Sequence, residues 1–228
     1  MKDAWGRTIE YIRLSLTDAC NFCCPYCRPA EITPQSQHQL LSVDEWMTIL
    51  GAFHQVGVKA VRLTGGEPLL YPHIEELLAR IKQTGWFEDI SMTTNGSLLA
   101  PRAAKLKELG LNRVNISLDS LDSDAFTLCV GKANQLDSVL NGIQSAIDAG
   151  FTSVKINTVL SRHWTDDEVH DLLHYVETWP VIWRFIEYMP FQGDAFHGPT
   201  FDEWKAQLER VSGGILTENH SVYGFGPA

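Results

Sequence analysis

The residues with the clearest chemical potential are cysteines, four of which crowd into one short segment near the N-terminus. Cys20, Cys24 and Cys27 form a C-x3-C-x2-C triplet, and Cys23 lies between the first two. Three thiolates can bind three irons of a cubane 4Fe-4S cluster and leave the fourth iron open to another ligand. Pro25 disfavours a continuous helix here, so we expect a loop that wraps around the metal centre.

A structural zinc site and unligated thiols are the alternatives on spacing alone. Zinc requires a fourth protein ligand at comparable spacing, which Cys23 could provide. The side chains of adjacent residues rarely both reach one ion, however, so the cluster is favoured and Cys23 is interpreted as a bystander. An odd cysteine count with this crowding is also a poor framework for disulfides. Cys129 stands alone in a helix-like stretch and is expected to be a small buried apolar side chain.

Strand-like runs alternate with amphipathic helical stretches along the whole chain. The expected strands are 11–16, 60–64, 89–94, 113–118, 153–160 and 181–187. Capping boxes are expected at Ser42, Thr165 and Thr200, each with a glutamate three residues later, and the last of them opens a helix over 201–211. Six such βα units predict a parallel sheet with right-handed crossovers, either an open doubly wound sheet or a partial (βα)6 barrel.

Polar residues at every second strand position favour the barrel. Asn115, Ser117 and Asp119 are one such set, and period two places them on one face. A parallel sheet covered by helices is normally apolar on both faces. We therefore predict an α/β fold, a partial (βα)6 TIM-like barrel whose polar inner face lines a ligand-filled lumen. The cysteine triplet follows the first strand, at the end where active sites of such folds gather.

Four cations lie within otherwise apolar strands, at Arg13, Arg62, Lys155 and Arg184. Isolated burial of a cation is costly. If these side chains converge on the lumen, an anionic ligand such as a triphosphate would compensate their charge, with arginine offering bidentate geometry. The alternative for each is an outward charge paired with a helix.

Length and charge limit the remaining functions. A chain of 228 residues suffices for one sizeable α/β domain. The net charge of −10 argues against partners such as nucleic acid or a membrane surface, because both favour a basic face. The sequence has no apolar run long enough to span a membrane, and its first residues lack the apolar segment of a secretory signal. We expect a cytoplasmic protein.

These motifs together resemble the radical S-adenosylmethionine (SAM) superfamily. The cysteine spacing with Tyr26 before the last cysteine is that superfamily's hallmark, and Gly65-Gly66-Glu67-Pro68 resembles its GGE segment, which binds the amino group of SAM. Within the superfamily, six ordered blocks look like the GTP 3′,8-cyclase family, the first enzymes of molybdenum cofactor biosynthesis. The blocks are 11–22, 61–68, 93–96, 115–121, 154–157 and 184–189.

The resemblance implies a radical reaction. SAM would chelate the open iron, and one electron from the cluster would release a 5′-deoxyadenosyl radical. That radical would abstract the 3′ hydrogen of GTP, whose ribose radical would attack C8 of guanine to give (8S)-3′,8-cyclo-7,8-dihydroguanosine 5′-triphosphate. An electron-donor protein such as a flavodoxin and a possible homodimer are also implied.

The family's site residues carry over by position. The implied cluster ligands are Cys20, Cys24 and Cys27. The implied SAM contacts are Tyr26, Gly66, Ser117 and Met189. The implied GTP contacts are Arg13, Arg62, Thr93 and Lys155, with Arg184 as a further phosphate ligand.

One departure concerns a second 4Fe-4S cluster that the family carries in a C-terminal extension. Its ligands are absent from this sequence, so we expect a barrel core over 1–198, the start of a truncated extension over 199–228, and a fragment that does not complete GTP cyclisation. A naturally shortened relative with altered activity is the alternative to a fragment. The alternatives are a radical SAM enzyme acting on another substrate, such as a peptide, and a non-catalytic zinc or redox-sensing domain.

Overall fold

The computed structural model describes residues 4, 6–27, 40–189 and 198–214. Its centre is a six-stranded sheet in which every neighbouring pair is parallel and the spatial order follows the sequence. The strands are β1 (Tyr11–Ser15), β2 (Ala60–Thr64), β3 (Asp89–Thr94), β4 (Arg113–Ser117), β5 (Ser153–Leu160) and β6 (Ile182–Glu187). With β1 and β6 as its two edges, the sheet is an open partial barrel, as the sequence predicted.

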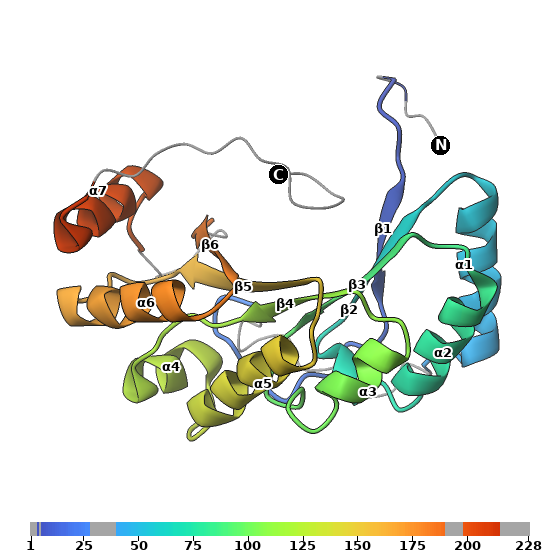
Figure 1. The fold of residues 1–228 in the computed structure, drawn as a ribbon, viewed down its shortest axis with the longest axis horizontal. Helices are drawn as coiled ribbons and strands as arrows, with labels where there is room; N and C mark the ends of the chain where they lie inside the picture. The colour runs from blue at the N-terminus through green and yellow to red at the C-terminus, as the bar shows by residue number, and fades with distance from the viewer. Residues whose placement is uncertain (1–3, 5, 28–39, 190–197, 215–228) are drawn as a thin grey trace.

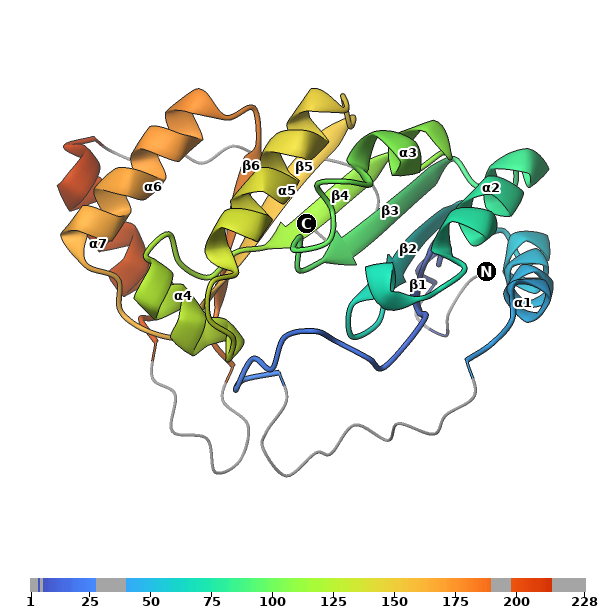
Figure 2. The ribbon, with the colours of Figure 1, turned by 90° about the horizontal axis from the view of Figure 1, so that it is seen from below.

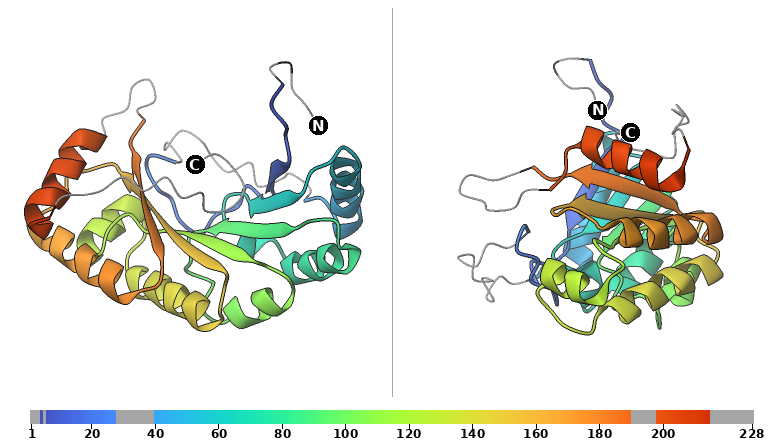
Figure 3. Two further views of the ribbon diagram at one scale, coloured as in Figure 1. Left: turned by 45° about the horizontal axis from the view of Figure 1, so that its top comes forward. Right: turned by 90° about the vertical axis from the view of Figure 1, so that its left-hand side faces the viewer.

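Helices follow the strands and cover the outer face of the curved sheet (Figures 1 and 3). The α-helices are α1 (Val43–Gln55), α2 (Ile74–Thr84), α3 (Ala103–Glu108), α4 (Ser123–Val130), α5 (Leu136–Asp148), α6 (Asp166–Thr178) and α7 (Phe201–Ser212). A short 3-10 helix, η1 (Pro68–Leu70), follows β2. The inner, concave face carries no helix of the described part, so it is the face that can receive a ligand (Figure 3).

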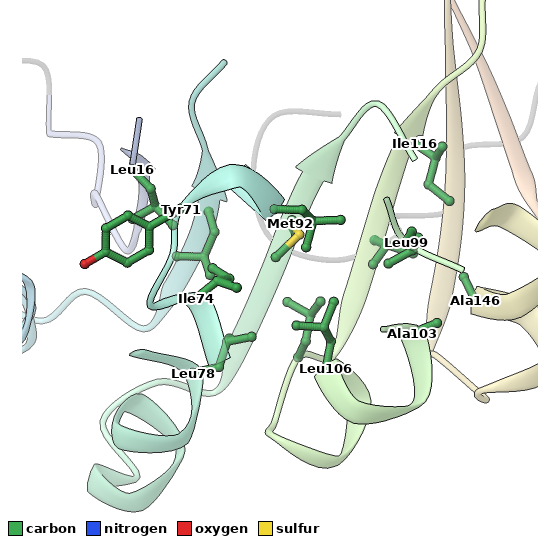
Figure 4. Close-up of a cluster of buried hydrophobic side chains, with 14 of the residues drawn as sticks. Leu16, Tyr71, Ile74, Leu78, Met92, Leu99, Ala103, Leu106, Ile116 and Ala146 are labelled. Carbon is green, nitrogen blue, oxygen red and sulfur yellow. The ribbon is translucent and has the colours of Figure 1, made fainter. Parts of the chain in front are cut away.

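The main core lies between the sheet and α1, α2, α3 and α5. Leu63, Met92, Ile116 and Ile156 point from the strands to this side and are fully buried. Figure 4 shows Met92 on the side of the sheet that faces Leu106 of α3. Burial of apolar area at roughly 25 cal/mol per Å² drives this packing. The apolar residues of each strand therefore face the helices and leave the alternate positions to the concave face.

The strand register gathers those alternate positions into rows on the concave face. Arg13 of β1 pairs with Arg62 of β2, and Asn115 of β4 pairs with Lys155 of β5. Asn157 of β5 pairs with Arg184 of β6. Partners in a parallel ladder share a face. The predicted polar inner face is confirmed.

A smaller cluster holds α7 onto α6 and the far end of the sheet. Leu160, Trp164 and Trp204 are buried in it, and Phe185 packs on the Trp204 ring at a centroid distance of 4.9 Å. All three expected capping boxes are present, at Ser42, Thr165 and Thr200. The expected boundary between 198 and 199 stays a prediction, and residues 215–228 of the expected extension lie outside the described residues.

Within the described ranges, none of the helices has both the length and the apolar character needed to cross a membrane.

Candidate functional site

The cysteine segment leaves β1 and runs along the carboxyl ends of the strands towards α4 (Figure 2). The backbone N–H of Cys23 donates to the carbonyl of Val130 at 2.9 Å. Gly131 ends α4 with φ of +66°, and a Cβ there would lie 2.6 Å from the carbonyl oxygen of Cys23. The close approach of Gly131 therefore lets the cysteine segment rest on the end of α4.

The segment borders a cavity of about 300 Å³ at the carboxyl ends of the strands. Eight of the twelve implied site residues line it: Cys20, Cys24, Cys27, Tyr26, Gly66, Ser117, Arg13 and Thr93. They come from β1, β3 and β4 and from the loops after β1 and β2. Three thiols, a tyrosine, one glycine-loop position, two strand positions and one cation therefore share one space.

The glycine pair after β2 makes room for the cysteine segment. The N–H groups of Gly66 and Glu67 donate to the carbonyls of Thr17 and Ala19 at 2.7 and 2.8 Å. A Cβ on Gly66 would lie 2.3 Å from the oxygen of Ala19, and one on Gly65 would lie 2.4 Å from that of Thr17. Both separations are far inside van der Waals contact. Glycine is needed here because two backbones touch.

Glu67, the acid of the GGE segment, stabilises the loop after β2 behind the cavity. Its side chain is fully buried and accepts hydrogen bonds from Thr94 Oγ1 at 2.7 Å, the N–H of Asn95 at 2.7 Å and the N–H of Leu69 at 3.0 Å. Burial raises the pKa of Glu67, and these hydrogen bonds oppose the rise. The carboxylate thus connects the loop after β2 to the loop after β3.

A second buried carboxylate, Asp119, fastens the other side of the cysteine segment. It accepts a short hydrogen bond from the hydroxyl of Tyr26 and one from the N–H of Val159 at 2.8 Å. Asp119 lines the cavity, and burial raises its pKa. The sequence placed Asp119 on the polar face without giving it a role. Its contact with Tyr26 spans 93 positions of sequence, which period-two reasoning does not reach.

The three thiols line one cavity and would bind metal as thiolates. Burial raises the pKa of the Cys24 thiol to about 12, with further contributions from Asp119, Cys27 and Cys20. A bound cation would reverse this effect by stabilising the thiolates. Across the described ranges, no group of three His, Cys, Asp or Glu side chains is placed to hold a metal ion. Ligands of a cubane lie on separate irons and need not converge on one point.

The cations form a second group on the concave face. Arg13 lines the cavity, whereas Arg62, Lys155 and Arg184 share the face beyond it. Arg62 donates to Ser91 Oγ at 3.4 Å and lies 5.2 Å from the centroid of the Tyr11 ring. Arg184 donates two hydrogen bonds to Asn157 Oδ1, at 3.0 and 2.6 Å.

Electrostatic repulsion connects this group. Burial lowers the pKa of Lys155, and the charges of Arg184, Arg113 and Arg62 lower it further. Burial likewise lowers the pKa of Arg62 and Arg184, with neighbouring arginines adding to the effect. Positive charge is therefore concentrated on the concave face, and an anionic ligand would stabilise it.

Arg113 is a cation that the sequence analysis missed. It forms a buried bidentate pair with Asp89, with hydrogen bonds of 2.6 Å from Nε and 2.5 Å from Nη2. Both residues begin strands and face the concave side. The signal was present in the pattern, because Arg113 has the same parity as Asn115 and Ser117. Its carboxylate partner lies on the neighbouring strand, and sequence alone did not indicate the pair.

Met189 is the implied SAM contact that the described structure does not bring to the cavity. Its side chain is 74% exposed, and it borders residues 190–197, which are not described. Thr93 and Ser117 line the cavity, and Asn115 Nδ2 lies 3.5 Å from Thr93 Oγ1.

Comparison with known proteins agrees with this arrangement. The family model of the radical SAM superfamily matches residues 14–176. The chain is 42% identical over 213 residues to GTP 3′,8-cyclase 2 of Pseudomonas aeruginosa, with 91% of this chain and 64% of that protein covered. It is 40% identical over 233 residues to GTP 3′,8-cyclase of Heliobacterium modesticaldum, with 100% of this chain and 71% of that protein covered. The chain therefore spans only part of the length of these relatives.

Among solved structures, Streptococcus suis SuiB bound to S-adenosylmethionine is similar with a TM-score of 0.69 and 20% sequence identity. The match covers 90% of this chain and 46% of SuiB. At that identity the likeness concerns the fold, and it agrees with an open parallel barrel.

Proposed function

The chain belongs to the radical SAM superfamily and, within it, to the GTP 3′,8-cyclase family, and on this premise we propose that its cavity holds a 4Fe-4S cluster, SAM and part of GTP. Cys20, Cys24 and Cys27 would bind three irons. Tyr26, Gly66, Ser117 and Met189 would contact SAM. Arg13, Arg62, Thr93, Lys155 and Arg184 would contact GTP. The observation that carries the proposal is that three thiols, the glycine loop and a cation line one cavity.

The cluster would supply the single electron that cleaves the sulfonium bond of SAM and so begins the radical reaction. The protein's own part is to position the reactants. The contact between the glycine loop and the cysteine segment fixes the wall beside the thiols, since Gly66 and Glu67 donate directly to that segment. Tyr26 is held by Asp119 on the opposite side. Such fixed geometry favours a near-attack arrangement of the reacting atoms.

The charge of the concave face supports a triphosphate as the anionic part of the substrate. Arg62 and Arg184 hydrogen-bond to neutral side chains, Ser91 and Asn157. The carboxylate of Asp89 is engaged in a bidentate pair with Arg113. Phosphate oxygens would offer these arginines charge-assisted, bidentate hydrogen bonds. We therefore place the phosphates towards the amino ends of the strands and the reacting ribose towards the thiols.

A one-electron donor is needed to start each turnover. We propose that a reduced flavodoxin-like protein fills this role. The relatives are longer than this chain, so the tests below measure cluster assembly, SAM cleavage and nucleotide binding rather than complete cyclisation.

Anaerobic reconstitution with iron and sulfide tests the cluster assignment. We expect Cys24→Ala to lose the iron–sulfur absorption and the reductive formation of 5′-deoxyadenosine from SAM. The adjacent Cys23→Ala is the matched control and should retain both, because Cys23 is exposed and its backbone, not its thiol, holds it to α4. A zinc site with four thiolates predicts instead that both variants lose metal. Retention of the cluster by Cys24→Ala would refute the ligand set.

Nucleotide binding tests the substrate assignment separately. The reconstituted protein should bind GTP through its phosphates, with inorganic triphosphate as a competitor. Equal indifference to GTP, ATP and triphosphate, in a protein that still cleaves SAM, would remove the cyclase assignment and leave a radical SAM enzyme with another substrate.

A further inference from the structure

The sulfur of Cys20 is approached by two N–H groups. The backbone N–H of Phe22 lies 3.4 Å from Cys20 Sγ, and the side-chain Nδ2 of Asn95 lies 3.9 Å from it. The first contact is local to the cysteine segment. The second comes from the loop after β3, 75 positions away in sequence. Asn95 also lines the cavity.

The orientation of the Asn95 amide is set by its neighbours. The backbone N–H of Ser97, which can only donate, lies 3.0 Å from Asn95 Oδ1, and Ser97 Oγ donates to the same oxygen at 2.8 Å. This identifies the oxygen end of the amide. The opposite end, Nδ2, therefore carries the two hydrogens, one directed to Asn21 Oδ1 at 2.8 Å and the other towards Cys20 Sγ.

The backbone of Asn95 is also held, so the side chain has a fixed origin. Its N–H donates to Glu67 Oε2 at 2.7 Å. Asn21 completes a closed ring of hydrogen bonds by donating from Nδ2 to Ser97 Oγ at 2.9 Å. The GGE glutamate, the loop after β3 and the first cysteine are thus parts of one network.

We propose that Asn95 is a positioning residue that donates an N–H···S hydrogen bond to the Cys20 thiolate and thereby raises the reduction potential of the cluster. The proposal rests on the proposed function, since it requires a cluster on Cys20. Reduction adds negative charge to the cluster and its sulfurs. A donor to a ligand sulfur stabilises that charge, so hydrogen bonds of this kind help set the potential.

The test is a redox titration of the reconstituted cluster, followed by electron paramagnetic resonance. Asn95→Ser removes the amide donor without adding charge, and Asn95→Asp keeps the oxygen that Ser97 needs but places a carboxylate near the sulfur. At the potential where the original cluster is half reduced, we expect the ratio of reduced to oxidised cluster to fall about tenfold in Asn95→Ser, equivalent to about 59 mV for one electron. In Asn95→Asp the same ratio should fall further, because the carboxylate adds negative charge near the sulfur.

Asn112→Ser is the matched control. Asn112 uses its side-chain oxygen to accept from the N–H of Ile90 at 2.8 Å, just before β4 and at the opposite end of the strands from the cysteines. Loss of the Asn112 amide should leave the reduction potential of the cluster unchanged. An effect of the hydrogen bond to Cys20 is thereby separated from a general loss of stability. Iron per chain is measured for each variant at the same time.

An unchanged potential in Asn95→Ser with full iron content would overturn the proposal. If Asn95→Asp binds less iron, Asn95→Ser decides alone, since it introduces no charge. Failure of the unsubstituted protein to assemble any cluster would instead refute the proposed function, so the two failures are distinguishable.

Discussion

Gly66→Ala should displace the cysteine segment, because the site depends on contact between two backbones. A Cβ at this position would lie 2.3 Å from the oxygen of Ala19 and 2.7 Å from that of Asp18. The closest favourable carbon–oxygen contacts are about 3.3 Å, so the two loops must separate by about 1 Å. All the nearest atoms are backbone, and no side-chain rotation can relieve the contact.

The separation stretches the hydrogen bonds from Gly66 to Thr17 and from Glu67 to Ala19. Each such bond contributes about 1 kcal/mol net, so we expect a loss of about 2 kcal/mol in the free energy of unfolding. A misplacement of about 1 Å can reduce a reaction rate about a hundredfold, and we expect SAM cleavage to fall by about that factor.

Urea unfolding, iron content and the rate of 5′-deoxyadenosine formation measure these effects. Gly150→Ala is the control, since its φ of +69° imposes backbone strain while a Cβ would meet nothing within 4 Å. It should cost about 1 kcal/mol and leave SAM cleavage unchanged. Full iron content with an undiminished cleavage rate in Gly66→Ala would refute the reasoning.

Three further predictions concern the cations and the packing of α7. Arg62→Ala should weaken GTP binding about thirtyfold, or about 2 kcal/mol, while SAM cleavage without substrate persists. The control Arg80→Ala, which removes a cation paired with Asp44 on the helical side, should keep both GTP binding and SAM cleavage. Equal titration curves for the two variants would contradict the phosphate assignment. Asp89→Asn should lower the free energy of unfolding, measured by urea denaturation, by about 3 kcal/mol, because it leaves Arg113 buried with less charge compensation. A loss below about 1 kcal/mol would show that the pair is dispensable. Hydrogen bonds from Arg210 and then Gln207 lower the pKa of Asp166 from 3.8 to about 2, so these contacts stabilise the fold above pH 4 and lose their effect as pH falls towards 2. Arg210→Ala should make the free energy of unfolding depend less on pH in that range, and an unchanged pH profile would argue against the assignment.

The sequence predicted most of the scaffold because the scaffold is encoded locally. Each predicted strand agrees with the structure to within one residue at either end, since alternating and continuous apolar runs are short-range patterns. The three capping boxes follow from a serine or threonine with a glutamate three residues later. Cys129 is buried, as expected for a lone apolar cysteine in a helix.

The meeting of the cavity residues could also be predicted from the sequence, because parallel strands place their carboxyl ends at one edge of the sheet. Thr93 and Ser117 reach the cavity for this reason. It did not predict which polar residues support the site. Asn95 and Asp119 act on residues 75 and 93 positions away, and only the three-dimensional register of loops establishes those contacts.

The buried pair of Asp89 and Arg113 illustrates the same limit. In the sequence, each of the two is only a polar residue at the start of a strand. Their bidentate contact depends on how β3 and β4 are aligned. Met189 shows the opposite case, in which a resemblance assigns a contact that the described part of the chain leaves exposed. Its role stays a prediction.

The central claim is that the three thiols bind a cluster with one iron left open for SAM. Electron paramagnetic resonance of the reduced, reconstituted protein with and without SAM tests it most directly. We expect a 4Fe-4S signal that changes when SAM is added, because SAM becomes a ligand of the open iron. A signal that SAM leaves unaltered, or metal analysis that finds zinc in place of iron, would contradict it.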